Sequence, residues 1–455
     1  MTVTGQPAVR YARSGDVHIA YQVSGDGPND VLLIPDGVIP IEAMLEEPHF
    51  AAFLARLSGF ARVIRFDRRG MGQSDPVAPS DPPTLERWAQ DAEAVLDAAG
   101  SKRTALVAMA EGGFVATLLA ATRPERCTAL VLIHATPGFV VEGFATGAPA
   151  KVLERIRAGL DSDTPVWGDV DWAIPLFAPS AIADVRYREW LSNAARRAMS
   201  PGMARALFDV VFKSDIRSVL STVRVPTLVI HRRWNLYVSP DHGRYVADRI
   251  PGARFVEVEG ADHVPYLGDA DPILAEIERF LTGSRPAASA DRVLSTILFG
   301  DIVGSTEKVA EVGDARWREL LLDYQSRVGR EVQRYGGRVI DWAGDGILAS
   351  FDGPARAVRA ACAIRASARS LGLDVRGAVH TGECEVVGDK LGGIAVHIGS
   401  RILGLASPGE VLASGTVHDL VAGSGLRFAD RGAHRLRGVA DEWRLYSVDQ
   451  TSAVI

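Results

Sequence analysis

The stretch TALVAMAEGGFVATLLAATRPERCTALVLIH, residues Thr104–His134, decides the fold of the first part of this 455-residue chain. Two short apolar runs, Thr104–Met109 and Ala129–His134, flank a helix-like segment. The same alternation of apolar and helix-like runs continues outward on both sides. Strands that are buried on both faces are apolar throughout. The pattern therefore predicts a mostly parallel sheet with helices on both faces.

The strands predicted before residue 260 are separated by helix-like segments. Thr84–Ala99 has apolar residues at helical spacing, with Thr84 as its expected N-cap. From about Gly138 to Ser221 the alternation stops, and the Trp-, Pro- and Ala-rich sequence predicts a helical lid. The predicted strands are Val31–Pro35, Ala61–Phe66, Thr104–Met109, Ala129–His134, Val225–His231 and Ala253–Val258.

A small, polar, proline-bearing segment, Thr282–Asp291, predicts a linker between two domains, residues 1–281 and 292–455. The pattern beyond it predicts an α+β domain. Its expected elements are a strand at Val293–Phe299, a long helix, a hairpin at Gly337–Phe351, a helix at Ala355–Leu371, strands at Val375–Thr381 and Glu385–Val387, and a helix at Gly393–Leu405.

Composition excludes several classes of protein. The net charge of −6 argues against a nucleic-acid binder or a polybasic membrane binder. Cys127, Cys362 and Cys384 are scattered, which predicts neither a disulfide framework nor a paired-cysteine zinc site. No apolar run reaches the length of a membrane span, and the N-terminus lacks the apolar core of a signal peptide. We therefore expect a cytoplasmic protein.

The first domain resembles the α/β-hydrolase family from Tyr11 to about Leu281. The resemblance rests on the strand order, on residues 111–132 with the preceding Ala110, on FDRRGMGQSD (Phe66–Asp75) and on GADHVP (Gly260–Pro265). It implies a mostly parallel sheet with helices on both faces and a helical lid.

The residues of the family's catalytic triad are largely replaced. A nucleophile elbow needs G-x-S-x-G, whereas the sequence here places Ala110 at the serine position. Asn235 falls at the acid position, where an amide cannot compensate an imidazolium, and His263 remains at the base position. The sequence therefore predicts a fold without serine hydrolysis. Two roles stay open, a sensor pocket for a small apolar ligand and a structural or dimerising role.

Two aspartates mark the second domain. Asp301 ends an apolar strand and precedes Gly304, Ser305 and Thr306, a turn whose free N–H groups and hydroxyls suit phosphate. Asp345 lies between two glycines at the expected hairpin tip. Each aspartate alone fits a simple turn or cap residue. Together with a triphosphate, two carboxylates form the ligand set that Mg²⁺ commonly receives.

This domain, from about Val293 to Val448, resembles the catalytic domain of class III nucleotide cyclases, which is α+β and ferredoxin-like. The resemblance implies conversion of ATP or GTP to the 3′,5′-cyclic nucleotide and pyrophosphate. It assigns two Mg²⁺ or Mn²⁺ ions to Asp301, Ile302 and Asp345. The motifs that carry it are ILFGDIVGST (Ile297–Thr306), WAGDGILASF (Trp342–Phe351), VHTGECEVVGDKLGGIAVHIGSRI (Val379–Ile402) and HRLRGVADEWRLYSV (His434–Val448).

The resemblance also assigns residues that contact the nucleotide. Arg401 matches the family's transition-state arginine, and His397 stands one helical turn earlier where the family often has asparagine. His397 can donate one hydrogen bond to the ribose, and its alternative role is that of a packed helix histidine. Arg437 matches the lysine that binds the triphosphate, together with the Gly304–Thr306 turn.

The base-reading pair departs from the family. Adenylate cyclases usually have lysine and aspartate where this chain has Asp341 and Lys390. Guanine offers donors at N1 and N2 and an acceptor at O6, so the exchanged charges suit guanine better than adenine. Asp389 restores an acid after a shift of one residue, and Asp341 could instead pair with Lys390 across a dimer interface. ATP and GTP both remain candidate substrates.

In this family one catalytic domain supplies the metal aspartates and its partner supplies the base-reading residues, histidine and arginines. This chain has one set of each kind, so a symmetric homodimer would build two composite sites.

Two other functions are alternatives to a cyclase. A serine esterase with a nucleotide-binding module conflicts with Ala110 and Asn235, and a purely binding sensor leaves Asp301, Asp345 and Arg401 without a purpose.

Overall fold

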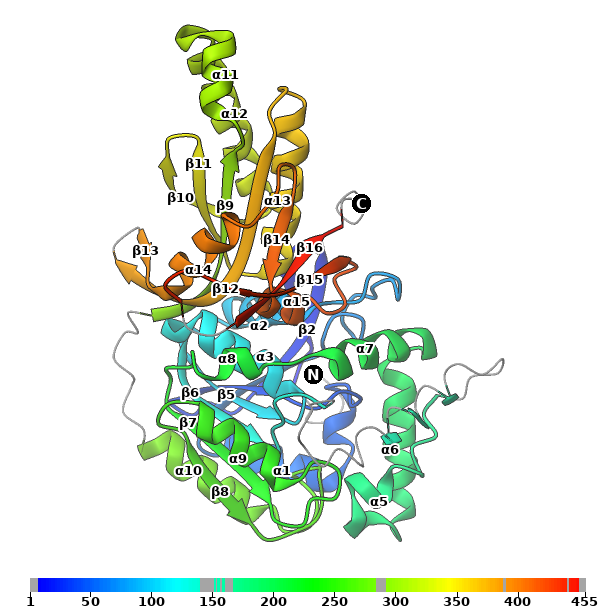
Figure 1. The fold of residues 1–455 in the computed structure, drawn as a ribbon. Coiled ribbons are helices and arrows are strands. Elements are labelled where there is room, and N and C mark those ends of the chain that lie inside the picture. Colours follow the sequence, from blue (N-terminus) through cyan, green and yellow to red (C-terminus); the bar gives the residue numbers. More distant parts are fainter. Residues whose placement is uncertain are drawn as a thin grey trace. The chain divides into compact units, whose positions relative to one another are not determined.

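The computed structural model describes residues 7–139, 151–152, 154–155, 158–159, 167–283, 292–387, 390–439 and 442–449. The chain forms two compact units, Met1–Ala290 and Asp291–Ile455 (Figure 1). Each unit has its own sheet and its own hydrophobic core. No described helix is long and apolar enough to cross a membrane.

The first unit is built on one sheet with the strand order β1-β2-β4-β3-β5-β6-β7-β8. From β4 to β8 neighbouring strands run parallel, as predicted, whereas β1 and β2 add an antiparallel edge that the sequence analysis did not include. The strands are β1 (Arg10–Ser14), β2 (Val17–Ser24), β3 (Asp30–Ile34), β4 (Arg62–Phe66), β5 (Thr104–Met109), β6 (Cys127–Ile133), β7 (Thr227–Arg232) and β8 (Arg254–Val258).

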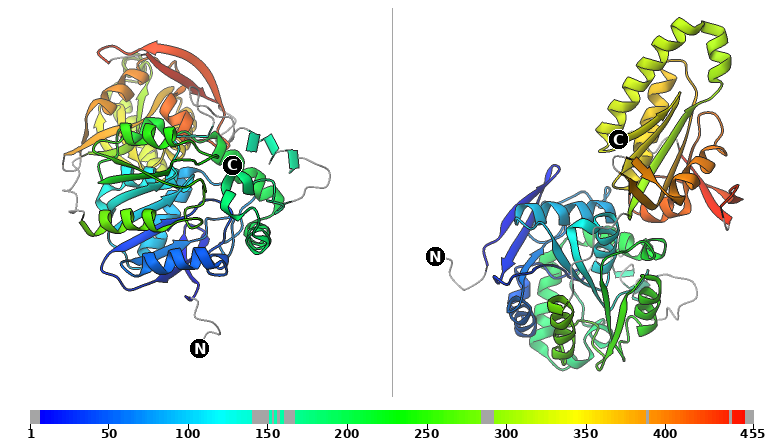
Figure 2. Two further views of the ribbon diagram at one scale, coloured as in Figure 1. Left: turned by 90° about the horizontal axis from the view of Figure 1, so that it is seen from below. Right: turned by 90° about the vertical axis from the view of Figure 1, so that its left-hand side faces the viewer.

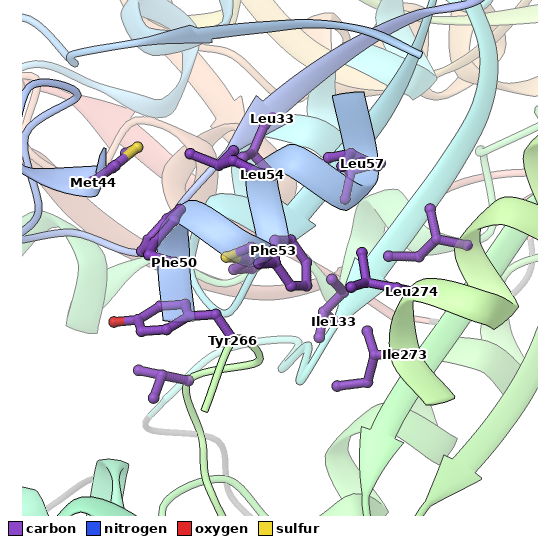
Figure 3. Packing of buried hydrophobic residues seen from close by; sticks show 14 of the residues in the cluster. Leu33, Met44, Phe50, Phe53, Leu54, Leu57, Ile133, Tyr266, Ile273 and Leu274 are labelled. Carbon is purple, nitrogen blue, oxygen red and sulfur yellow. The ribbon is translucent and has the colours of Figure 1, made fainter. Parts of the chain in front are cut away.

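Helices cover both faces of this sheet (Figure 2). On one face α1 and α10 pack together through Phe53, Leu57 and Ile273, which lie in one buried cluster (Figure 3). Thr84 caps α2 as predicted, because its side chain accepts a hydrogen bond from the Arg87 N–H at 3.2 Å. The main helices are α1 (Pro48–Ser58), α2 (Leu85–Ala98), α3 (Gly112–Thr122), α9 (Pro240–Arg249) and α10 (Asp271–Gly283).

The described part of the predicted lid is helical. It contains α5 (Ile174–Phe177), α6 (Val185–Ala198), α7 (Pro201–Lys213) and α8 (Arg217–Leu220). Residues 140–150 and several positions up to 166 lie outside the described residues. At the other end of the domain, α10 continues through the first two residues of the predicted linker, and residues 284–291 lie outside the description.

The second unit is a mixed sheet with the order β10-β11-β9-β12-β14-β16-β15, and β13 pairs with β12. Only β12 and β14 run parallel among these neighbours. The strands are β9 (Arg292–Ile302), β10 (Arg338–Ala343), β11 (Gly346–Phe351), β12 (Val375–Val387), β13 (Lys390–Gly392), β14 (Val411–Ser414), β15 (Phe428–Arg435) and β16 (Glu442–Val448).

The prediction of two separate strands at Val375–Thr381 and Glu385–Val387 is wrong. The whole of β12 is one strand, because its pairing with β9 is unbroken from Val375 opposite Ile302 to Glu385 opposite Arg292. Gly382 suggests a strand end in the sequence. In the structure it packs against α14, where an added Cβ would come within 2.9 Å of the Ala395 side chain.

Helices also cover both faces of the second sheet. On one face, α12 and α13 pack against Leu298, Ile302 and Val379. On the other face, α14 packs so closely against β9 that a Cβ at Gly399 would lie 2.9 Å from the Phe299 ring. The helices are α11 (Ser305–Val312), α12 (Asp314–Arg334), α13 (Pro354–Arg369), α14 (Ile394–Leu403) and α15 (Gly415–Leu420).

Candidate functional site

The two aspartates of the second unit lie on neighbouring strands. Asp301 is the penultimate residue of β9, and Asp345 occupies the tight turn between β10 and β11. Since β11 pairs with β9 through Ile347 opposite Gly300, the turn comes level with Asp301. A Cβ added to Gly346 would lie 3.7 Å from Oδ1 of Asp301. The hairpin therefore brings the two carboxylates to the same end of the sheet.

Polar atoms near this pair lack protein partners. Oδ2 of Asp345 and the Tyr324 hydroxyl are buried with no hydrogen-bond partner in the described part of the chain. Burial, and then the charges of Asp301 and Asp345, raise the pKa of Tyr324, which places this residue close to both carboxylates. An unpartnered buried carboxylate oxygen beside a second carboxylate is a suitable donor set for a divalent cation.

One oxygen of Asp301 is engaged within the protein. Arg376, directly opposite on β12, donates from Nη2 to Oδ2 of Asp301 at 2.8 Å. This ion pair is partly exposed, with a quarter to a third of each side chain accessible. Oδ1 of Asp301 faces the hairpin and stays available. No group of three or more His, Cys, Asp or Glu side chains that could hold a metal occurs among the described residues.

The turn after Asp301 leads directly into α11. Gly304 has a φ of 68°, in the left-handed region, and precedes the helix that starts at Ser305. No side chain caps the first amides of α11. The backbone N–H groups of Ser305 and Thr306 therefore begin a helix next to the carboxylates, as the phosphate-binding prediction requires. Ile302 itself is buried in the core beneath this turn.

The predicted nucleotide-contacting residues of α14 face solvent. His397 and Arg401 are both exposed, one turn apart, and neither has a side-chain partner in the described regions. The alternative of a packed histidine at His397 does not apply within this unit, because the side chain is exposed. Arg437 follows Leu436, which packs with Ile398 and Ile402 of α14. The structure thus brings exposed Arg437 to the same helix.

The base-reading candidates come from neighbouring elements. Asp341 is exposed on β10, where Oδ1 accepts a hydrogen bond from the Trp342 N–H at 2.8 Å. Lys390 begins β13, a short strand that contacts β10. The side chain of Lys390 and the whole of Asp389 lie outside the described residues. Whether Asp341 and Lys390 act together stays a prediction.

In the first unit the elbow geometry persists without a nucleophile. Ala110 lies between β5 and α3 with a φ of 46°, unusual for a residue with a side chain. Its N–H donates to the Ile133 carbonyl at 2.9 Å. A Cβ on Gly112 would lie 2.5 Å from the Ile34 carbonyl oxygen, which explains the glycine there. The turn is therefore that of a hydrolase elbow, carrying a methyl group in place of a hydroxyl.

The structure brings Asn235 and His263 together, and their hydrogen bonds define the histidine tautomer. Oδ1 of Asn235 accepts from the N–H groups of Tyr237 and Val238 at 3.0 and 3.1 Å. Its Nδ2 must then donate to Nδ1 of His263, 3.1 Å away. The proton of neutral His263 consequently sits on Nε2. A general base in a triad needs Nε2 free of its proton, so this histidine has the opposite tautomer.

A buried arginine holds the loop that carries His263. The Arg232 side chain is inaccessible to solvent, and burial lowers its pKa. Backbone carbonyl groups, instead of water molecules, accept hydrogen bonds from its guanidinium group, as a buried cation requires. The carbonyls that accept from Arg232 are those of Asp262, Val264, Pro265, Leu267 and Asp269. Burial also lowers the pKa of His263 to about 3 and keeps it neutral.

A cavity of about 160 Å³ in this unit contains polar residues that the sequence analysis missed. Asp36 and Glu111 line it together with His263. Their sequence signals were present, because Asp36 follows an apolar strand directly and Glu111 follows the nucleophile position. Aromatic side chains form much of the wall, namely Phe139, Trp167, Trp172, Phe177, Phe208, Phe212 and Tyr237.

Known proteins share the architecture of the N-terminal domain. Residues 45–270 match the family model of the alpha/beta hydrolase fold, and the N-terminal domain has that fold. The enol-lactonase from Burkholderia xenovorans shares the fold, with a TM-score of 0.51 and 23% identity over 60% of this chain and 100% of the other.

Two curated relatives also match the N-terminal domain. The karrikin insensitive 2 receptor CA of Petunia hybrida is 24% identical over 224 residues, 48% of this chain and 82% of the receptor. The pimeloyl-acyl-carrier-protein methyl ester esterase of Aeromonas hydrophila is 27% identical over 259 residues, 56% of this chain and 96% of the esterase.

A further solved structure, the adenylyl cyclase CyaB from P. aeruginosa, matches with 23% identity over 35% of this chain and 94% of the other. The TM-score of 0.33 is too low for this likeness to support an assignment. The function of the C-terminal unit is therefore inferred from its own residues.

Proposed function

We propose that this protein is a class III nucleotide cyclase whose N-terminal hydrolase-fold domain is a ligand-binding regulatory module. The observation that carries the proposal is the pair of carboxylates at the end of β9 and in the β10–β11 turn. Oδ2 of Asp345 is buried without a partner in the described protein, and Asp301 lies on the adjacent strand. A metal-bound triphosphate would supply the missing partner.

Each residue has a defined role in this proposal. Asp301 and Asp345, with Ile302 beside them, would hold two Mg²⁺ or Mn²⁺ ions, which would supply Lewis-acid stabilisation of the negative charge on the ribose 3′-oxygen and on pyrophosphate. The first amides of α11, at Ser305 and Thr306, bind phosphate oxygens. Arg401 and Arg437 neutralise charge on the transferring phosphate, and His397 orients the ribose.

The topology supports a ferredoxin-like cyclase domain. Apart from α11, which precedes α12, the elements β9, α12, β10, β11, α13 and β12 follow one another as β-α-β-β-α-β, and their strands take the order β10-β11-β9-β12. This is the split β-α-β arrangement of ferredoxin-like folds. In the proposed homodimer, residues of α14 contact the nucleotide that is bound at the metal site of the partner subunit.

The direct test incubates the purified chain with ATP or GTP and Mg²⁺ or Mn²⁺, and measures cyclic nucleotide by chromatography. We expect a 3′,5′-cyclic nucleotide and pyrophosphate in equal amounts. Nucleotide that binds but is returned unchanged under every condition would instead favour a binding-only sensor.

Serine hydrolysis is not expected from the N-terminal domain. We predict no labelling by a fluorophosphonate, in the parent protein or in Ala110→Ser, because the His263 tautomer cannot accept the serine proton. The measurement is mass spectrometry of the labelled chain, with an active esterase as a positive control. Adduct on the peptide that contains residue 110 would contradict the prediction.

Asp341 and Lys390 are expected to act as a unit in selecting the base. The double change Asp341→Lys with Lys390→Asp should shift the kcat/KM ratio toward ATP by about tenfold, because one unmet buried donor or acceptor costs about 1–3 kcal/mol. Each single change should be worse than the double, since it places like charges together. Asp314→Asn, at an exposed position, is the control. An unchanged ratio in all variants would show that these side chains do not read the base.

A further inference from the structure

The cavity of the N-terminal domain differs chemically from an esterase pocket. Acyl transfer requires N–H donors aimed at a developing oxyanion. Here the Glu111 carboxylate lies against Gly37, so closely that a Cβ on Gly37 would come within 2.7 Å of Oε1. A carboxylate therefore occupies the region beside the elbow where an anion would otherwise be stabilised.

Two carboxyl groups in this cavity, Glu111 and Asp36, lie near a single buried cation, Arg68. Glu111 has a buried counter-ion, since Nη1 of Arg68 lies 3.8 Å from Oε1. Arg68 is further held by the Pro35 carbonyl, to which Nη2 donates at 2.8 Å. Asp36 has no such partner, and its Oδ1 is buried without a hydrogen bond to any described residue. One cation thus serves two carboxyl groups.

The raised pKa of Asp36 is consistent with a carboxyl group that lacks a cationic partner of its own. Burial, and then the charge of Glu111, raise the pKa of Asp36 to about 7, although Arg68 opposes the shift. A positively charged group against Asp36 would favour its ionised form and satisfy its oxygen.

The remaining walls restrict the ligand further. His263 is neutral and nine-tenths buried or more, its Nε2 has no partner in the described chain, and its tautomer offers only a donor. It can neither accept from a cation nor supply a charge for an anion. Aromatic rings surround the space, including those of Tyr237 and Phe177, whose centroids lie 4.2 Å apart with the ring planes tilted by 34°. Such rings favour an apolar body and attract cations through their faces.

We propose that this cavity binds a small apolar molecule with a protonated primary amine, whose ammonium group pairs with Asp36. The ammonium makes a charge-assisted hydrogen bond to the unpartnered Oδ1 of Asp36, and the apolar body lies among the aromatic rings. Arg155 and Asp169, both exposed, also line the cavity and carry opposite charges. The inference rests on the ligand-binding role proposed for this domain and does not depend on cyclase activity.

The test is isothermal titration calorimetry of the full chain without nucleotide. The probes are 2-phenylethylamine, 2-phenylethanol and 3-phenylpropanoate, which share one ring and a two-carbon spacer but carry a cation, a neutral group and an anion. We expect the amine to bind at least about tenfold more tightly than either of the others. Equal or tighter binding of the carboxylate, or no binding of the amine at millimolar concentration, would overturn the proposal.

Asp36→Asn identifies the group responsible. It should weaken binding of the amine by at least about tenfold and leave binding of the alcohol within about threefold of the parent. Asp169→Asn, which removes an exposed carboxylate from the same cavity, should leave both within about threefold. Equal losses from the two variants would mean that the amine responds to overall charge and would refute the assignment of Asp36. The comparison of the three probes on the parent protein stands even if Asp36→Asn fails to fold.

Discussion

Asp345→Asn is expected to lower kcat/KM for cyclisation by at least about a thousandfold, because loss of metal assistance removes about 4 kcal/mol or more of transition-state stabilisation. Asp301→Asn should have an effect of the same size. The two carboxylates share one end of the sheet, and Oδ2 of Asp345 has no other described partner. Cyclic nucleotide formation over a range of Mn²⁺ concentrations is the measurement.

A binding measurement separates a metal role from a structural one. Removing one of two neighbouring negative charges relieves repulsion, so Asp345→Asn should unfold at the same temperature as the parent or higher without metal. Mn²⁺ should raise the melting temperature of the parent by mass action and should not raise that of the variant. Asp314→Asn, an exposed carboxylate on α12, is the matched control and should behave as the parent does. A variant with parental turnover and parental metal dependence would refute the assignment.

Mixing two inactive chains is expected to restore activity. Asp301→Asn lacks the metal side of a site, and Arg401→Ala lacks the α14 side. If each site is shared between two chains, a mixed dimer has one site with both defects and one site with none. With free exchange half of the dimers are mixed, so about a quarter of the parental activity should return.

The control for this experiment is a mixture of Asp301→Asn with Asp345→Asn. These changes affect the same side of the site, so every site in their mixed dimer carries a defect and no activity should return. Subunit exchange is verified with two affinity tags on the two chains. If exchange is complete and Asp301→Asn with Arg401→Ala stays inactive, the site is built within one chain and the composite homodimer is wrong.

Much of the fold could be predicted because local patterns and packing agree. The strands β3 to β7 are buried on both faces, so their continuous apolar runs identified them, and Thr84 marked the start of α2. The strands β1 and β2 were not predicted, because β2 joins the sheet only through antiparallel pairing with the distant β4, and β1 then pairs with β2. The break placed within β12 was wrong, because only cross-strand pairing with β9 shows that the strand continues past Gly382.

The amino-acid sequence by itself determined which chemistry the residues can perform. Ala110 has no nucleophilic atom and Asn235 has no charge, whatever their surroundings. Tertiary structure decided how the other groups are used, since hydrogen bonding and burial depend on neighbours far apart in the chain. Contacts of Asn235 with two backbone amides set the tautomer of His263, and the loop after β3 brings Asp36 into the same cavity as Glu111, whose counter-ion is Arg68. In the same way, only the pairing of β11 with β9 brought Asp345, 44 residues along the chain, level with Asp301.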